Sequence, residues 1–390
     1  MGRGGAAEDV ERIVREQHEL WGSIPYDRYV FLNLITESGG GIEHKNSSVL
    51  MTSRWQMRDR ERYLDWLTLV SHELFHAWNV KRLRPVELGP FDYENEVHTR
   101  SLWVAEGLTV YYGALIVHRA GLSSRDEYFA EVTDEIQRLQ TTPGRLVQTV
   151  EQSSYDAWIK YYRQNENSRN TTVSYYTKGA VTGFLLDAKL RRMTGGTRSL
   201  DDVMRLAYDR YSGSRGFTPP EFRATVEDAL GTDADLDPWF DHVLETAEEL
   251  DYSEVLDWFG LDLASSASSG TDHDDDTPRA WVGLVTQADG EQLLVTQVRR
   301  GTPGFDAGFS VGDEILAIDD YRVRSNGWTD RLRLYRAGEE ASVLVARRDR
   351  LLRLGVTFGA KPQTRWELGP RSVQTAAQHY RVDAWLGTEP

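Results

Sequence analysis

The sequence His72-Glu73-Leu74-Phe75-His76 is an H-E-x-x-H motif inside a segment, 58–80, whose apolar residues predict a helix buried nearly all round. Because a helix turns about 100° per residue, the two histidines face one side about a turn apart and can ligate one metal ion. Glu73 lies beside them, where it can take a proton from a water activated by that ion. The alternative, a chance pair of core histidines, leaves polar groups unsatisfied in an apolar helix unless a ligand binds them.

A hydrolytic zinc site needs a third protein ligand and one open position for water. The candidates are Glu106, His98 and His118. Glu106 fits best because it is the single carboxylate of an apolar segment, 102–120, that is also predicted to be a buried helix, whereas His98 lies in a polar stretch. The alternative role for Glu106 is an ion pair with an arginine. The sequence therefore predicts one ion, for which zinc is the best fit and cobalt or manganese are alternatives.

The composition excludes several classes of function. The formal net charge of −16 argues against nucleic acid or an anionic membrane surface as the main partner. The chain has no cysteine, which excludes disulfides, thiolate metal sites and a cysteine nucleophile. The sequence contains neither an apolar run of signal-peptide length at its start nor the run of about 18 apolar residues that a membrane span requires. We therefore expect no membrane span and a cytoplasmic location as written, although truncation of the N-terminus could have removed a signal peptide.

At 390 residues the chain is too long for one ordinary core and suits two or three domains. A Ser- and Asp-rich stretch separates a part with helical periodicity from a part with short alternating strands and Gly turns. The predicted division is an N-terminal helical remnant, 1–24, a mainly helical catalytic domain, 25–263, a linker, 264–278, a small β-rich domain, 279–361, and a C-terminal tail, 362–390.

Two further elements are predicted in detail. Residues 29–35 read as a buried strand that forms a hairpin edge with a second short strand at 47–52. Residues 365–390 read as a terminal helix that docks on the rest of the protein through its apolar side chains, Val373, Ala376, Ala377 and Tyr380.

The motif together with Trp103-x-x-Glu106-Gly107 resembles the gluzincin metallopeptidases, whose third ligand is such a glutamate. The stretches 25–29 (PYDRY), 40–44 (GGIEH) and 76–85 (HAWNVKRLRP) resemble the M61 glycyl aminopeptidase family, and the resemblance runs from about residue 25 to the end. It implies an α+β multidomain fold with a thermolysin-like, mainly helical zinc-peptidase domain followed by a small β-rich domain. It also implies a zinc aminopeptidase that hydrolyses N-terminal residues, preferably Gly or Ala, from peptides with a free N-terminus.

Two more site residues follow from this resemblance. Glu43, in Gly41-Ile42-Glu43-His44-Lys45-Asn46, resembles the glutamate that binds the substrate α-ammonium, a charge that only chain ends possess. The alternative is an exposed turn after three glycines. Tyr176, in Tyr175-Tyr176-Thr177-Lys178-Gly179, resembles the tyrosine that donates a hydrogen bond to the oxyanion of the transition state. Tyr175 is then a core aromatic, although the two tyrosines could exchange roles.

The resemblance also gives an expected mechanism. Zn²⁺ held by His72, His76 and Glu106 activates a water molecule and polarises the scissile carbonyl. Glu73 takes the proton of the water and passes it to the leaving amine. Tyr176 and the zinc ion stabilise the oxyanion.

The C-terminal part has a resemblance of its own. The segments 281–284, 301–309 and 311–318 resemble a bacterial PDZ domain that spans about 279–361. Such a domain would capture a chain-end carboxylate or an extended peptide by β-augmentation at the backbone of 282–284. The alternative is a packing module that binds no peptide.

The sequence departs from the family at its start. Members usually have a long β-rich domain before the Pro-Tyr-Asp segment, whereas 24 residues precede Pro25 here. That domain would help to wall the substrate cleft and cover apolar surface. Two rival functions therefore stand beside the aminopeptidase: a catalytically inactive, PDZ-containing peptide-binding protein, and an endopeptidase that uses the same zinc.

Overall fold

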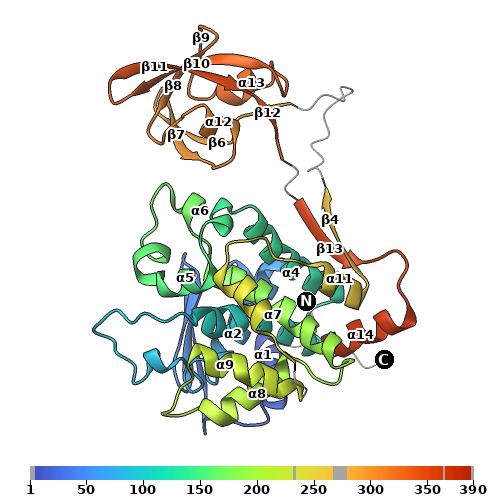
Figure 1. The fold of residues 1–390 in the computed structure, drawn as a ribbon. Coiled ribbons are helices and arrows are strands. Elements are labelled where there is room, and N and C mark those ends of the chain that lie inside the picture. Colours follow the sequence, from blue (N-terminus) through green and yellow to red (C-terminus); the bar gives the residue numbers. More distant parts are fainter. Residues whose placement is uncertain (1–4, 232–233, 267–278, 363–364, 388–390) are drawn as a thin grey trace.

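The computed structural model describes residues 5–231, 234–266, 279–362 and 365–387. It contains a large helical body, formed by the described residues up to 266 together with 365–387, and a smaller β domain, residues 280–360 (Figure 1). The expected mixed α and β, multidomain architecture is confirmed. Most of the predicted linker, from residue 267 to 278, lies outside the described residues.

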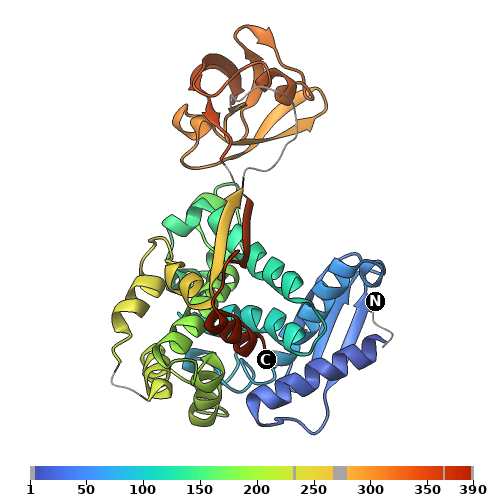
Figure 2. The same cartoon turned by 90° about the vertical axis from the view of Figure 1, so that its right-hand side faces the viewer.

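A helix and a small sheet form the first part of the body (Figure 2). The helix α1 (Ala6–Trp21) precedes the strands β1 (Val30–Ile35), β2 (Gly40–Glu43) and β3 (Ser47–Thr52). The strand order is β1-β3-β2, with β1 parallel to β3 and β2 antiparallel to β3. The hairpin is therefore formed by β2 and β3, and the prediction that paired 29–35 with 47–52 as a hairpin is wrong. Gly40 and Gly41 begin the second strand, β2.

The prediction that the first strand is buried is also wrong. Leu32, Leu34 and Ile35 are 48%, 49% and 59% exposed. The apolar run of β1 is typical of a buried strand, but β1 ends its sheet, and within the described residues its outer edge has no partner strand.

Four helices form the centre of the body. These are α2 (Arg60–Phe75), α3 (Leu108–Arg119), α4 (Arg125–Gln140) and α7 (Tyr175–Met193), and α3 packs against the other three. Their starts follow from the sequence, because the side chains of Asp59, Ser124 and Ser174 accept hydrogen bonds from the first turns of α2, α4 and α7. The turn before α3, η3 (Trp103–Gly107), is π-helical.

Shorter helices complete the body, in agreement with the helical periodicity of this part of the sequence. They are α5 (Val150–Tyr155), α6 (Ser168–Thr171), α8 (Leu200–Tyr211), α9 (Pro219–Leu230), α10 (Asp237–Phe240) and α11 (Ser253–Phe259), with single turns η1 (Gln56–Arg58), η2 (Val86–Leu88), η4 (Pro143–Leu146), η5 (Ala157–Tyr161) and η6 (Asp241–Glu245). Among the described helices, none has the length and apolar composition that crossing a bilayer requires.

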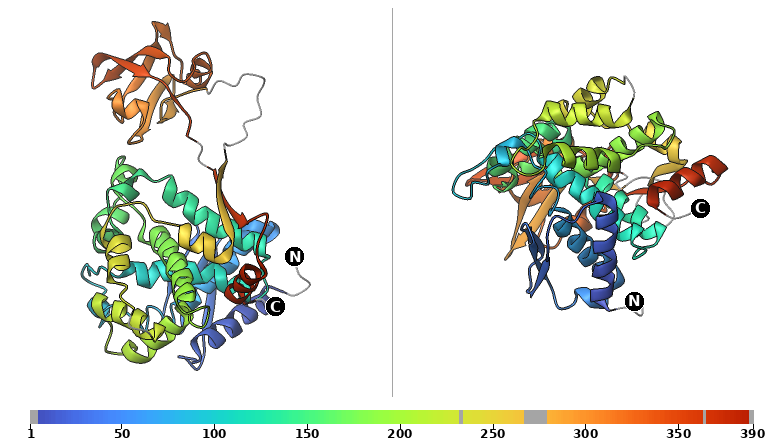
Figure 3. Two further views of the ribbon diagram at one scale, coloured as in Figure 1. Left: turned by 45° about the vertical axis from the view of Figure 1, so that its right-hand side comes forward. Right: turned by 90° about the horizontal axis from the view of Figure 1, so that it is seen from below.

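The chain leaves the body and returns to it through two paired strands. The strand β4 (Leu261–Ser266) is antiparallel to β13 (Arg365–Pro370), and the two lie side by side in Figure 3. Residues 264–266, which the prediction places at the start of the linker, belong to β4. The predicted single helix from 365 onward is wrong, since a strand precedes the helix α14 (Ala376–Leu386).

The helix α14 docks on the body, but by a different face from the one expected. Val373 and Tyr380 are 83% and 61% exposed, whereas Trp385 is fully buried. The indole ring of Trp385 stacks on Phe259, with ring centroids 4.6 Å apart, and its Nε1 donates a hydrogen bond to the Tyr111 hydroxyl. The last turn of the helix, which carries Val382, Trp385 and Leu386, supplies the apolar contact instead.

The β domain has a core of its own. It contains β5 (Ala280–Trp281), β6 (Leu284–Asp289), β7 (Gln292–Val298), α12 (Pro303–Asp306), β8 (Glu314–Ile318), β9 (Tyr321–Arg322), α13 (Trp328–Leu332), β10 (Glu340–Arg347), β11 (Arg350–Thr357) and β12 (Gly359–Ala360). The main sheet has the order β11-β10-β8-β7-β6. One side chain of the body binds this domain twice: Asn170 on α6 donates to the carbonyl of Val298 and accepts from the amide of Arg300.

Candidate metal centre and active site

Three predicted side chains meet where α2 ends and η3 begins its turn. His72 and His76 present Nε2 atoms 3.1 Å apart, and Glu106 Oε2 lies 3.4 and 3.3 Å from them. Three potential ligand atoms thus face one point, which suits a His₂Glu metal site.

The surroundings of the Glu106 carboxylate also favour metal binding. Glu106 Oε2 is buried and accepts no hydrogen bond within the described chain, and its ion-pair partners there are His72 and His76 rather than an arginine. A buried carboxylate oxygen without a donor is costly unless a cation binds it. The other two candidate ligands lie elsewhere: the Nδ1 atom of His98 is bonded to the Tyr155 carbonyl, and His118 packs on Tyr128.

One asparagine holds the two ligand-bearing elements together. The Nδ1 atom of His76 lies 2.8 Å from the carbonyl of Asn79, which can only accept, so Nδ1 carries the proton and Nε2 is free to bind a metal. The Asn79 side chain donates to the Val104 carbonyl and to the hydroxyl of Thr109. Asn79 lies in the sequence stretch that carries the family resemblance, but no sequence pattern indicated this role.

Glu73 points toward the same site from the next position on α2. Its side chain is buried, its Oε2 has no hydrogen-bond partner in the described residues, and burial raises its pKa. The backbone of β2 packs directly on this carboxylate: a Cβ atom at Gly41 would collide with it. Glycine at position 41 is therefore required for the observed position of Glu73.

The site has a strongly negative potential. Burial opposes the charged form of His76, but Glu106, Glu43 and Glu73 outweigh it and raise the pKa of His76 to about 10. Burial also opposes the charge on Glu106, yet the two histidines lower its pKa far below the usual value. Three carboxylates thus favour positive charge at one buried point, which a divalent cation would supply.

Glu43 lies at the end of β2 and reaches this cluster, with a carboxylate oxygen within 4.8 Å of ligand atoms of Glu73 and His76. Its Oε1 atom is 2.9 Å from Nζ of Lys81, which is 9% exposed and also packs over the Phe91 ring. Burial favours the neutral acid, but His76 and Lys81 lower the pKa of Glu43. One oxygen of Glu43 thus already has a cationic partner, which the sequence did not reveal.

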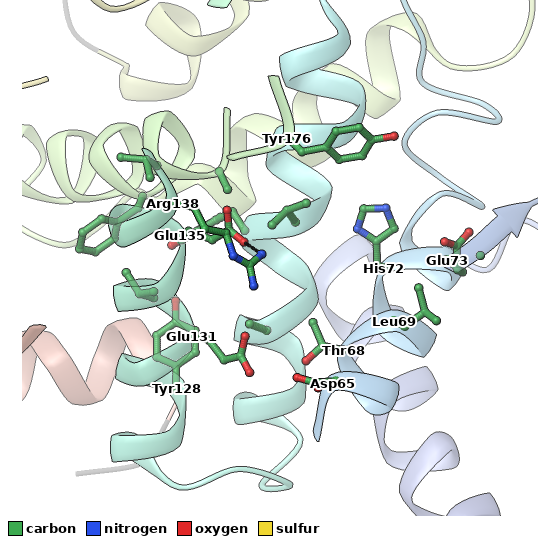
Figure 4. A pocket seen from close by; sticks show the side chains of 18 of the residues that line it. Asp65, Thr68, Leu69, His72, Glu73, Tyr128, Glu131, Glu135, Arg138 and Tyr176 are labelled. Atoms are coloured by element: carbon green, nitrogen blue, oxygen red, sulfur yellow. Dashed lines mark hydrogen bonds and ion pairs between the residues drawn. The ribbon is translucent and has the colours of Figure 1, made fainter. Parts of the chain in front are cut away.

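The two adjacent tyrosines occupy different environments. Tyr175 is 1% exposed and belongs to the core, whereas Tyr176 lines a cavity together with His72 and Glu73 (Figure 4). The hydroxyl of Tyr162 lies 3.2 Å from that of Tyr175 and 3.5 Å from that of Tyr176. Burial, followed by the charge of Glu106, raises the pKa of Tyr176 well above its usual value, so the phenol stays protonated and can donate a hydrogen bond.

Two glycines bring Tyr176 and Glu106 near each other. A Cβ atom at Gly179 would lie 2.8 Å from the Cα atom of Gly107, so the backbones of α7 and η3 touch at this point. Each glycine closes one of the motifs quoted above, Trp103-x-x-Glu106-Gly107 and Tyr176-x-Lys178-Gly179. Their function in the fold is close helix packing, which sets the distance between the third candidate ligand and the phenol.

Comparisons with known proteins find a protein family and a similar solved structure. The M61 glycyl aminopeptidase family matches residues 65–182, a range that contains His72, Glu73, His76, Glu106 and Tyr176. The crystal structure of an aminopeptidase N family protein from Idiomarina loihiensis is similar over 97% of this chain, with 28% identity and a TM-score of 0.83. The chain spans 66% of the length of that protein.

Other structural matches are too weak to support a conclusion. The HtrA-type protease AlgW with decapeptide matches 22% of this chain and 30% of its own, with 22% identity and a TM-score of 0.21. A serine endoprotease from Yersinia pestis matches 22% of this chain and 30% of its own, with 24% identity and a TM-score of 0.20. No curated protein matches the sequence.

Proposed function

Because residues 65–182 belong to the M61 peptidase family, we propose that this chain is a metal-dependent aminopeptidase, with zinc as its metal. The observation that carries the proposal is the buried oxygen of Glu106, which lacks a hydrogen bond and faces the Nε2 atoms of His72 and His76. Glu73 and Tyr176 line a cavity together with His72.

A zinc ion bound by His72, His76 and Glu106 would lower the pKa of water and polarise the scissile carbonyl. Glu73 accepts the proton of the attacking water and delivers it to the leaving amine, a role that suits a buried carboxylate with a raised pKa. Tyr176 donates a hydrogen bond to the oxyanion as it forms. In this scheme Glu43 binds the α-ammonium of the substrate through the oxygen that Lys81 leaves free.

Hydrolysis of Gly- and Ala-p-nitroanilide by purified, zinc-loaded protein tests this function. Turnover should be lost in Glu73→Gln, in a chelated sample and with an N-acetylated substrate. Cleavage of the acetylated substrate would instead indicate an endopeptidase. Stoichiometric zinc binding without any turnover would indicate a peptide-binding protein, and the aminopeptidase proposal would then be wrong.

For the β domain we propose a PDZ-like role, in which β6 pairs with an extended peptide. The proposal is supported by the position of β6 at the end of its sheet, where its outer edge is unpaired within the described strands. Gly283, just before β6, has a positive φ of +81° and packs on Thr302, so a side chain is excluded there. Fluorescence anisotropy with a peptide and its C-terminally amidated form distinguishes capture of a carboxylate from capture of an extended segment, and absence of binding to both contradicts the proposal.

A further inference from the structure

A cavity of about 490 Å³ extends from the candidate metal centre into the body, between α2, α4 and α7 (Figure 4). His72, Glu73 and Tyr176 are among the residues that line it. Its walls also include the apolar side chains of Val110 and Val132. The cavity is therefore continuous with the proposed catalytic site and large enough for a long side chain.

Carboxylates of α2 and α4 also line this cavity, among them that of Asp65, which is exposed to solvent. Asp65 lies seven residues before His72 on α2, about two turns along the same face of the helix. Glu131 and Glu135 lie one turn apart on α4. In Figure 4 the carboxylates of Asp65 and Glu131 point toward one another across the cavity.

The cations of the protein do not balance these carboxylates. Arg138 pairs with Glu135, at 2.9 Å between Nη1 and Oε1, and its own side chain is 65% exposed. Within the described part of the chain, neither Asp65 nor Glu131 forms an ion pair or a side-chain hydrogen bond. Burial, followed by repulsion from Asp65, raises the pKa of Glu131 to about 7. Three carboxylates and one arginine leave an excess of negative charge that a ligand cation would stabilise.

The position of the cavity relative to Glu43 and the metal centre indicates which residue of the substrate it would face. Glu43 lies near His76, at the C-terminal end of α2, and does not line the cavity. The cavity begins at His72, one turn earlier, and continues toward Asp65. If the α-ammonium is bound at Glu43 and the scissile carbonyl lies at the metal centre, the next residue of the substrate faces the cavity.

We propose that this cavity is the subsite for the residue that follows the scissile bond, and that it selects lysine or arginine there. The inference rests on the proposed aminopeptidase function. The apolar walls hold the methylene groups of the side chain, and Asp65 and Glu131 bind its charged end. An apolar side chain would leave the carboxylates unpaired, and an acidic one would be repelled by them.

The test compares Gly-Lys-amide, Gly-Arg-amide, Gly-Leu-amide and Gly-Glu-amide as substrates of the zinc-loaded full chain. For the lysine and arginine substrates, kcat/KM should exceed that for the leucine substrate by about tenfold or more, with glutamate the poorest. In the double variant Asp65→Asn/Glu131→Gln this preference should disappear, because kcat/KM for the lysine and arginine substrates should fall to that for the leucine substrate. The matched control is Asp126→Asn, an exposed carboxylate of α4 outside the cavity, which should keep the preference.

A binding measurement separates failure of this inference from failure of the proposed function. Calorimetric titration of the Glu73→Gln protein with Gly-Lys-amide and Gly-Leu-amide should show tighter binding of the lysine peptide, and the double substitution should abolish the difference. This result supports the subsite even if the wild-type protein hydrolyses nothing. Equal affinity for the two peptides, or a lysine preference that survives the double substitution, overturns the proposal.

Discussion

The helical body and the β domain are stabilised in different ways. The body buries many polar and charged side chains, and one of them, Asp187, accepts hydrogen bonds from Tyr111, Arg191 and the amide of Leu200. In the described β domain the core is aliphatic and aromatic, and the one charged side chain buried there is Asp313, paired with Arg347. Buried ionic contacts fix the relative positions of distant segments, which a site assembled from α2, η3, α7 and β2 requires. A sheet instead aligns its strands through backbone hydrogen bonds.

The largest expected effect breaks the network in the body. Asp187→Ala leaves the buried guanidinium of Arg191 without its partner and should lower the free energy of unfolding of the body by about 3–5 kcal/mol. Differential scanning calorimetry should show the transition of the body moving to lower temperature while that of the β domain stays in place. The control is Asp209→Ala, an exposed residue of α8. A joint shift of both transitions would contradict the distinction between the two parts.

A second variant removes a buried ammonium group that destabilises the body. Lys178 is 1% exposed, and burial lowers its pKa from 10.5 to about 8. The folded protein therefore binds fewer protons than the unfolded chain between these two values, so wild-type stability should rise with pH across that window. Lys178→Met should stabilise the protein by up to about 3 kcal/mol below pH 8.

The gain from Lys178→Met should vanish as the pH approaches 10.5, where the unfolded lysine is also neutral. Urea unfolding of both proteins at several pH values measures it. If the gain in unfolding free energy were independent of pH, its cause would be packing rather than charge.

A third variant examines the contact between sheet and helix at the candidate active site. Gly41→Ala places a methyl group on the carboxylate of Glu73 and should lower kcat/KM for Gly-p-nitroanilide by about 100-fold with little change in melting temperature. Gly39→Ala is the matched control, because nothing lies within 4 Å of a Cβ atom there. Equal activity of the two variants would show that the position of Glu73 does not depend on β2.

The smallest expected effect concerns the contact between the two parts. Asn170→Ala removes both hydrogen bonds to the β domain and should weaken its docking by about 1–2 kcal/mol. Small-angle scattering should show a broader distribution of distances than for wild type or for Thr171→Ala, and hydrolysis of Gly-p-nitroanilide should change by less than about twofold. An unchanged distribution would mean that β4 and β13 alone hold the domain in place.

The sequence predicts the relative positions of site residues best where they lie on a single helix. The spacing of His72 and His76 specifies their common face without knowledge of the rest of the fold, and Glu106 stood out as a single carboxylate in an apolar helix. Contacts between distant segments left no such signal: neither the ion pair of Lys81 with Glu43 nor the facing of Asp65 and Glu131 follows from a local pattern.

Other errors had a similar cause. An apolar strand indicates a buried one only if another layer covers it, and the sequence of β1 does not say whether one does. For α14, the sequence does not show that Trp385 makes the buried contact. Its partners, Phe259 and Tyr111, lie more than a hundred residues earlier in the chain. The zinc identity, the Gly or Ala preference, the domain boundaries and the cytoplasmic location stay predictions.

The pairing of β4 with β13 has a consequence for the order in which the protein folds during synthesis. The β domain is an insertion between two segments that belong to one core, because Trp385 packs on Phe259 and bonds to Tyr111. A ribosome therefore completes the entire inserted domain before it delivers the last side chain of the body. The β domain can reach its native state on the nascent chain, whereas the helical body must wait with an open core until translation has passed residue 385.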